Sequence, residues 1–275
     1  MKFAVLTSAL ALAAGVSLLP APLLADDLDD ALAALKQAEP SKDAAKVKEL
    51  AAAAHTTARK YEGPAPADAD KESYEARQRY AKDVDHYSEY ALYALASQMR
   101  SNPNVAEDLI NTLEKQNPKS EYLELPDALD VQADIAVARK QTDRAAAIAN
   151  RMIAAANKKP PEGTSAADWD RTKSYALGKA YYIIGTSACE RNKFADTDRN
   201  LRAALPYIKG NNGMLGPALF CLGVANYNLA NLTANKAKML EAAKFSEQAA
   251  AIPGPTQDQA YKNSIAMKQA ADRMR

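Results

Sequence analysis

The chain has 275 residues, 48% of them hydrophobic and 25% charged, so it is long enough to bury a continuous core. Lysine and arginine (35) balance aspartate and glutamate (34), and no segment interleaves clustered basic residues with aromatic ones. Because a polyanion is held by a basic field, this composition argues against a nucleic-acid partner. Ten glycines and few β-branched runs argue against a sheet, so we expect an all-α fold.

Residues 1–25 have the pattern of a secretory signal peptide. Lys2 precedes an apolar run from Phe3 to Leu19, which is too short for a spanning helix and is followed by no stop-transfer charges. We expect cleavage after Ala25, which removes Lys2 and takes the formal charge from +1 to zero. The sequence therefore predicts an exported chain, periplasmic or secreted, without membrane insertion after cleavage.

Residues 26–62 predict a pair of helices divided at Pro40-Ser41, with Ser41 as the N-cap of the second helix. Residues 63–71 are rich in proline and alanine and lack periodicity, so we expect a connector there.

Glu72–Met99 predicts the longest periodic helix. Four tyrosines recur along it at helical spacing: Tyr80, Tyr87, Tyr90 and Tyr93. Helical aromatic spacing most often fills the core between helices. The alternative is a recognition groove, because a tyrosine ring can pack while its hydroxyl stays in reach of water.

The segment from Ser174 to Leu205 predicts a helix, a tight turn at 192–194 and a second helix. Its first helix carries Leu177-Gly178-x-Ala180 and Ile184-Gly185. The same words recur 38 residues later, as Leu215-Gly216-x-Ala218 and Leu222-Gly223. A period of this size predicts stacked helical hairpins.

The sequence resembles the tetratricopeptide repeat in these motifs, in the turn before Phe194 and in the closing motif Leu201-x-x-Ala204-Leu205. The resemblance implies an α-solenoid, a right-handed superhelix of about four antiparallel hairpins over residues 72–253. Residues 26–62 would then be an N-terminal helical pair and residues 254–275 a C-terminal capping helix. The secretory leader and the run from 166 to 211 also resemble exported bacterial proteins of this kind.

Two registers of the repeat remain open, one with Gly185 at the small position of the first helix and one with Gly178. In the first register, the last hairpin needs a short insertion between Asn231 and Lys238 before the pattern resumes at Ala242.

In the resembling family, ligands lie in a concave groove lined by the first helix of each repeat. The positions carried over to this chain are Lys179, Tyr182, Thr186 and Glu190 in one repeat and Tyr227 and Asn228 in the next. The family's carboxylate clamp needs lysine and asparagine where this chain has Ala91 and Leu95, so recognition of a C-terminal carboxylate is not implied. The resemblance thus implies a non-enzymatic scaffold or adaptor that binds a protein or peptide segment.

Two other classes of function stay open. One is a structural component of a cell-envelope assembly that holds its neighbours, including copies of itself, through outer faces and helix ends. The other is an enzyme, which we disfavour because no convergent acid, base or nucleophile is visible.

No cofactor or metal ion is expected. His55 and His86 lie in separate segments without the spacing of a zinc site. His86 follows Asp83 and Asp85, and we interpret it as a solvated histidine rather than as part of an acid–base pair.

Another acidic group follows in the next predicted hairpin. Asp127, Asp130 and Asp134 share one side of a predicted helix, and we interpret them as an exposed acidic face.

Cys189 and Cys221 are the only cysteines. The 38-residue period makes position 227 the equivalent of Cys189 in the next repeat. Cys221 lies six residues before that position, which corresponds to about 9 Å of helical rise. A disulfide needs Cα atoms within about 7 Å, so we expect two buried free thiols rather than a bridge.

Overall fold

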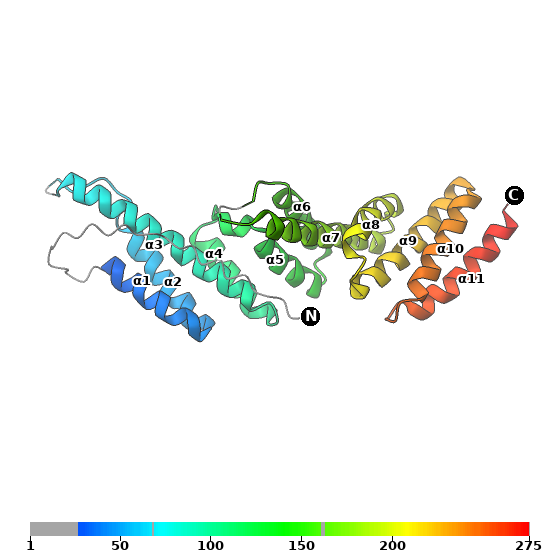
Figure 1. The fold of residues 1–275 in the computed structure, drawn as a ribbon, viewed down its shortest axis with the longest axis horizontal. Coiled ribbons are helices and arrows are strands. Elements are labelled where there is room, and N and C mark those ends of the chain that lie inside the picture. Colours follow the sequence, from blue (N-terminus) through cyan, green and yellow to red (C-terminus); the bar gives the residue numbers. More distant parts are fainter. Residues whose placement is uncertain (1–26, 68, 161–162, 275) are drawn as a thin grey trace. The chain divides into compact units, whose positions relative to one another are not determined.

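The computed structural model describes residues 27–67, 69–160 and 163–274, and the predicted signal peptide lies outside them. Over the described residues the fold is all-α, without a strand (Figure 1). The chain divides into two compact units. Unit 1 comprises Met1–Val131 and Pro160–Ser165, and unit 2 comprises Gln132–Lys159 and Ala166–Arg275.

Unit 1 is built from successive helices that pack in chain order. They are α1 (Asp27–Ala38), the 3-10 turn η1 (Glu39–Ser41), α2 (Ala44–Arg59), α3 (Lys71–Gln98), α4 (Pro103–Gln116) and the 3-10 turn η2 (Glu121–Glu124). Helix α1 also contacts α3, and α2 contacts α4, so the apolar stripes of all four share one core. Its fully buried side chains include Leu28, Leu35, Val47, Val84, Leu92 and Leu113. Each leucine of this kind stabilises the fold by roughly 2 kcal/mol relative to an exposed one.

The predicted N-cap of α2 is wrong by two residues. Asp43 caps the helix by accepting a hydrogen bond from the Lys46 backbone N–H at 3.1 Å. The Ser41 hydroxyl instead donates to the Ala38 carbonyl at 2.6 Å. The reason is η1, an extra turn after α1 that ends at Lys42 in the left-handed region and so delays the start of α2.

Helix α5 (Pro126–Ala138) is divided between the units at residue 131. The other helices of unit 2 are α6 (Thr142–Ala156), α7 (Ala166–Glu190), α8 (Phe194–Ile208), α9 (Asn212–Thr233), α10 (Lys236–Ala250) and α11 (Gln257–Arg273). From α6 onward each helix packs on the next (Figure 1). Helix α7 also contacts α9, and α9 contacts α11. Alternate helices therefore lie beside one another, as stacked hairpins require.

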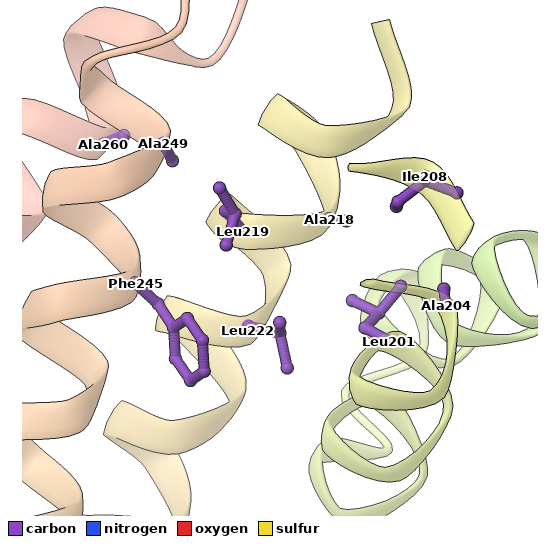
Figure 2. Packing of buried hydrophobic residues seen from close by; sticks show 9 residues of the cluster. All are labelled: Leu201, Ala204, Ile208, Ala218, Leu219, Leu222, Phe245, Ala249 and Ala260. Carbon is purple, nitrogen blue, oxygen red and sulfur yellow. The ribbon is translucent and has the colours of Figure 1, made fainter. Parts of the chain in front are cut away.

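The core between α8, α9 and α10 is a cluster of apolar side chains (Figure 2). Leu201 and Ile208 come from α8, Leu219 and Leu222 from α9, and Phe245 from α10. Ala260 brings α11 into the same cluster. In α11 Met267 is also buried, whereas Ile265 is exposed.

Helix α8 continues through Pro206 and ends at Ile208. Proline removes one helical hydrogen-bond donor, which normally ends a helix. Here the last turn packs against α7: a Cβ built on Gly178 would lie 2.6 Å from Tyr207 Cβ and 3.4 Å from Ile208 Cγ2. Tertiary packing thus overrides the local signal.

Glycines bring the two helices of each repeated hairpin into close contact. A Cβ on Gly185 would lie 2.5 Å from Leu201 Cδ2 and 3.1 Å from the Leu201 backbone nitrogen. A Cβ on Gly223 would clash with the Ser246 hydroxyl and lie 3.3 Å from the Ala242 carbonyl oxygen. The glycines are 38 residues apart and their partners 45, so the last hairpin carries seven extra residues. Similar glycine contacts thus occur in both hairpins, with a longer segment between glycine and partner in the second.

We expect Gly185→Ala and Gly223→Ala each to destabilise the protein. Overpacking costs about 1–3 kcal/mol and exceeds the gain of about 1 kcal/mol from alanine's helix propensity. Thermal unfolding followed by circular dichroism measures the effect. Gly210→Ala is the matched control, because nothing lies within 4 Å of its built Cβ. Equal melting temperatures for all three variants would contradict the close-contact explanation.

Candidate functional site

Helices α7 and α9 present a continuous stripe of incompletely buried side chains, which we call the α7–α9 face. On α7 these residues recur at spacings of three and four: Tyr175, Lys179, Tyr182, Thr186 and Cys189. On α9 they are Pro217, Cys221, Val224 and Asn228. Because α7 and α9 pack together, and Cys221 lies near both Cys189 and Tyr182, the two stripes meet.

The charged member of the α7 stripe is paired within unit 2. Lys179 Nζ lies 2.6 Å from Asp134 Oδ1, the lysine side chain is only 11% exposed, and its ammonium lies 5.8 Å from the centroid of the Tyr175 ring. A cation held this way positions its neighbours more than it attracts a distant anion.

Two polar members of the stripe bond to their own helices. The Thr186 hydroxyl donates to the Tyr182 carbonyl at 2.9 Å, and the Asn228 amide donates to the Val224 carbonyl at 2.8 Å. Their hydrogen-bonding groups are therefore engaged in the free protein, and they offer a partner mainly shape and apolar surface.

The remaining predicted groove residues are Tyr182, Glu190 and Tyr227. The half-buried Tyr182 packs against the Leu201–Leu219 core, and burial raises its pKa, with Cys221 and Glu190 nearby. Glu190 ends α7 and accepts a hydrogen bond from the Thr142 hydroxyl at 3.3 Å. Tyr227 packs against a separate core cluster that includes Met239. The structure thus brings Lys179, Tyr182 and Thr186 onto one helix face and places Tyr227 apart from them.

Cys189 lies on α7 and Cys221 on α9, two helices that pack together. Interaction with Cys221 lowers the pKa of Cys189, whereas interaction with Cys189 and burial raise the pKa of Cys221. Both cysteines are free and half-buried. The two free thiols agree with the sequence prediction, whereas their expected burial is only partial.

A hollow of about 750 Å³ lies between α8, α9 and α10. Its apolar lining comes from Leu205, Leu215, Leu219 and Ile252, and Arg202 and Lys209 stand at its edge. The sequence pattern did not predict this hollow, because its lining residues come from three helices and do not form one sequence motif.

In unit 1, aromatic rings from α3 and η2 form one cluster. Tyr122 stacks on Tyr93 with centroids 5.4 Å apart, and Tyr90 lies 5.9 Å from Tyr122 and 5.8 Å from Tyr87. Tyr90 is 36% exposed, so the cluster is partly buried and partly at the surface, and a recognition role for it stays a prediction. Tyr80 is separate, and its hydroxyl donates to Asp29. Tyr122 was missed because η2 has no periodicity.

The two histidines have different surroundings. His86 has a 57% exposed side chain, as the solvated interpretation requires, and its Nε2 lies 2.8 Å from Glu121 Oε1. Asp85 turns away from it, and its Oδ1 lies 2.6 Å from His55 Nδ1. The acid–base pair is therefore not assembled.

The expected acidic face of α5 is wrong for Asp130, which is 1% exposed and is paired with Arg100. Arg100 also donates to Asp127 Oδ1 at 3.3 Å, and Asp134 pairs with Lys179. Each carboxylate of the group therefore has a cation beside it, which spacing along one helix could not show.

Within the described part of the chain, no three histidine, cysteine or acidic side chains gather as a metal site would require. None of the helices there is long and apolar enough to cross a membrane.

Comparisons with family models, with curated proteins and with solved structures found no significant match to this chain. The tetratricopeptide resemblance therefore remains a prediction from the sequence.

Burial raises the pKa of Tyr87, Tyr93 and Tyr122, so these phenols keep their protons in the folded state at pH values where the unfolded chain has lost them. Stability is then fully present below the ordinary tyrosine pKa of 10.0 and is lost as the pH rises above it. Thermal unfolding between neutral and strongly alkaline pH measures this loss. Tyr93→Phe should reduce the alkaline loss, whereas Tyr261→Phe, at an exposed site, should not. If the melting temperatures of both variants fell equally steeply with rising pH, buried Tyr93 would not be a source of the alkaline loss.

Removing Arg100 leaves the buried Asp130 carboxylate without the charge beside it. We expect Arg100→Ala to cost about 3 kcal/mol of unfolding free energy. Lys48→Ala breaks the exposed Lys48–Asp108 pair and should cost less than about 1 kcal/mol. Urea unfolding of the two variants compares them, and equal losses would show that the burial of Asp130 does not matter.

Proposed function

We propose that this protein is an exported, non-enzymatic scaffold of the tetratricopeptide-like solenoid type. It binds a protein or peptide segment on the α7–α9 face and needs no cofactor. The export part of the proposal rests on the pattern of residues 1–25.

One observation carries the binding proposal: incompletely buried side chains continue across two neighbouring helices of successive hairpins. A helix turned only toward the core leaves no such stripe. In stacked hairpins, the alternate helices form the surface on which an extended or helical segment can lie.

The chemistry of the face indicates how such a segment is held. Lys179 is paired with Asp134, and Thr186 and Asn228 bond to their own helices, so the face offers few free polar groups. Tyr182 contributes a half-buried ring at its centre. Recognition then depends on shape and aromatic contact rather than on charge.

The first experiment cross-links the exported protein in its native envelope and identifies the joined peptides by mass spectrometry. A protein captured through residues of the α7–α9 face supports the proposal and supplies the partner for a binding assay. Only self-cross-links, or contacts confined to helix ends and outer faces, would instead support the structural component of an envelope assembly.

With that partner, Thr186→Arg tests the face directly. The arginine places bulk at the centre of the stripe, so we expect the Kd to rise at least about tenfold. Thr233→Arg is the matched control: Thr233 also bonds to the carbonyl four residues earlier, at 2.8 Å, but is exposed at the end of α9.

Circular dichroism verifies that both variants fold. If Thr186→Arg binds normally and Leu215→Arg does not, the docking site is the hollow between α8, α9 and α10, and the proposal for the α7–α9 face is overturned.

A further inference from the structure

We propose that the hollow between α8, α9 and α10 binds a fatty-acid anion, with the alkyl chain in the hollow and the carboxylate at Lys209. The lining of this hollow shares no residue with the α7–α9 face. The proposal therefore does not depend on whether a peptide binds to that face.

One side of α8 forms a wall of the hollow. Its lining residues fall at positions i, i+3, i+4 and i+7 of one helix face: Arg202, Leu205, Pro206 and Lys209. Roughly 10 Å of helical rise separates the two cations, and the two apolar residues lie between them.

The other walls of the hollow are mainly apolar. Leu219 belongs to the buried cluster of Figure 2, whereas Leu205, Leu215 and Ile252 pack against that cluster and are only partly buried. An alkyl chain in the hollow removes the exposed part of these side chains from water. Each methylene group that becomes buried in this way strengthens binding by about fourfold.

The charges around the hollow determine which head group such a chain should carry. Arg202 and Lys209 line the hollow, and no carboxylate is among the described residues that do so. Arg202 is held through Nε by Asp198 at 2.8 Å and through Nη2 by Glu241 at 2.9 Å. These two acids already balance the charge of Arg202.

Lys209 is the cation that remains for a ligand. It is the exposed C-cap residue of α8, and it forms no ion pair with another described residue. An ammonium group attracts a carboxylate and repels a cationic head group. Because an exposed ion pair contributes little, the chain supplies most of the affinity and Lys209 supplies the preference for an anion.

The test titrates the full chain with octanoate, decanoate and decyltrimethylammonium, each below its critical micelle concentration, by isothermal titration calorimetry. We expect decanoate to bind at one saturable site, with a Kd about tenfold lower than that of octanoate. Its Kd should also be lower than that of decyltrimethylammonium, which has the same chain length. Absence of saturable decanoate binding, or equal or tighter binding of the cationic compound, would overturn the proposal.

Charge reversal tests the role of Lys209. Lys209→Glu should invert the preference, so that decyltrimethylammonium binds more tightly than decanoate. Lys193→Glu is the matched control, because Lys193 is the N-cap residue at the opposite end of α8 and does not line the hollow. An unchanged preference in Lys209→Glu, or the same inversion in Lys193→Glu, would show that Lys209 does not hold the head group.

Two further variants locate the alkyl chain. Ala251 is exposed and lines the hollow, so the ring of Ala251→Trp covers the apolar wall and should raise the Kd of decanoate at least about tenfold. Thr186→Arg, on the α7–α9 face, should leave this Kd unchanged, and circular dichroism verifies that both variants fold. The opposite result would place the alkyl chain on the α7–α9 face and overturn the site in the hollow, whereas capture of a peptide partner is measured separately.

Discussion

Unit 2 depends on how closely the two helices of a hairpin approach each other. Gly185 and Gly223 bring α7 onto α8 and α9 onto α10 at distances that exclude even a methyl group. Once each hairpin is closed in this way, Leu201, Leu222 and Phe245 bury one another between neighbouring helices (Figure 2). The half-exposed stripe is the part of α7 and α9 that this packing does not bury.

The sequence predicted the helices well because their signals are local. Apolar periodicity, the Asn192 turn and the repeated Leu-Gly words each act within a few residues, and all correspond to observed elements. A proline normally ends a helix, but Pro206 stays helical because Gly178 admits the turn after it. This outcome depends on tertiary packing, which a periodicity does not contain. The expected N-cap at Ser41 is wrong for a local reason, because a 3-10 turn delays the start of α2.

In the candidate site, too, the sequence predicted what local spacing determines and missed what contacts between segments determine. The repeat placed Lys179, Tyr182 and Thr186 on one helix face, as observed. It could not show that Lys179 is already paired with Asp134, or that Tyr122 completes the tyrosine cluster from the short 3-10 turn η2.

The bonds that Thr186 and Asn228 make to their own helices have a thermodynamic consequence. A surface whose donors are already satisfied loses little when water leaves it, because no strong hydration bonds are broken. Association on such a surface removes mainly apolar area from water, and its signature is a negative heat-capacity change rather than a steep dependence on ionic strength. Thr186 and Asn228 need no ligand to satisfy their hydrogen-bonding groups.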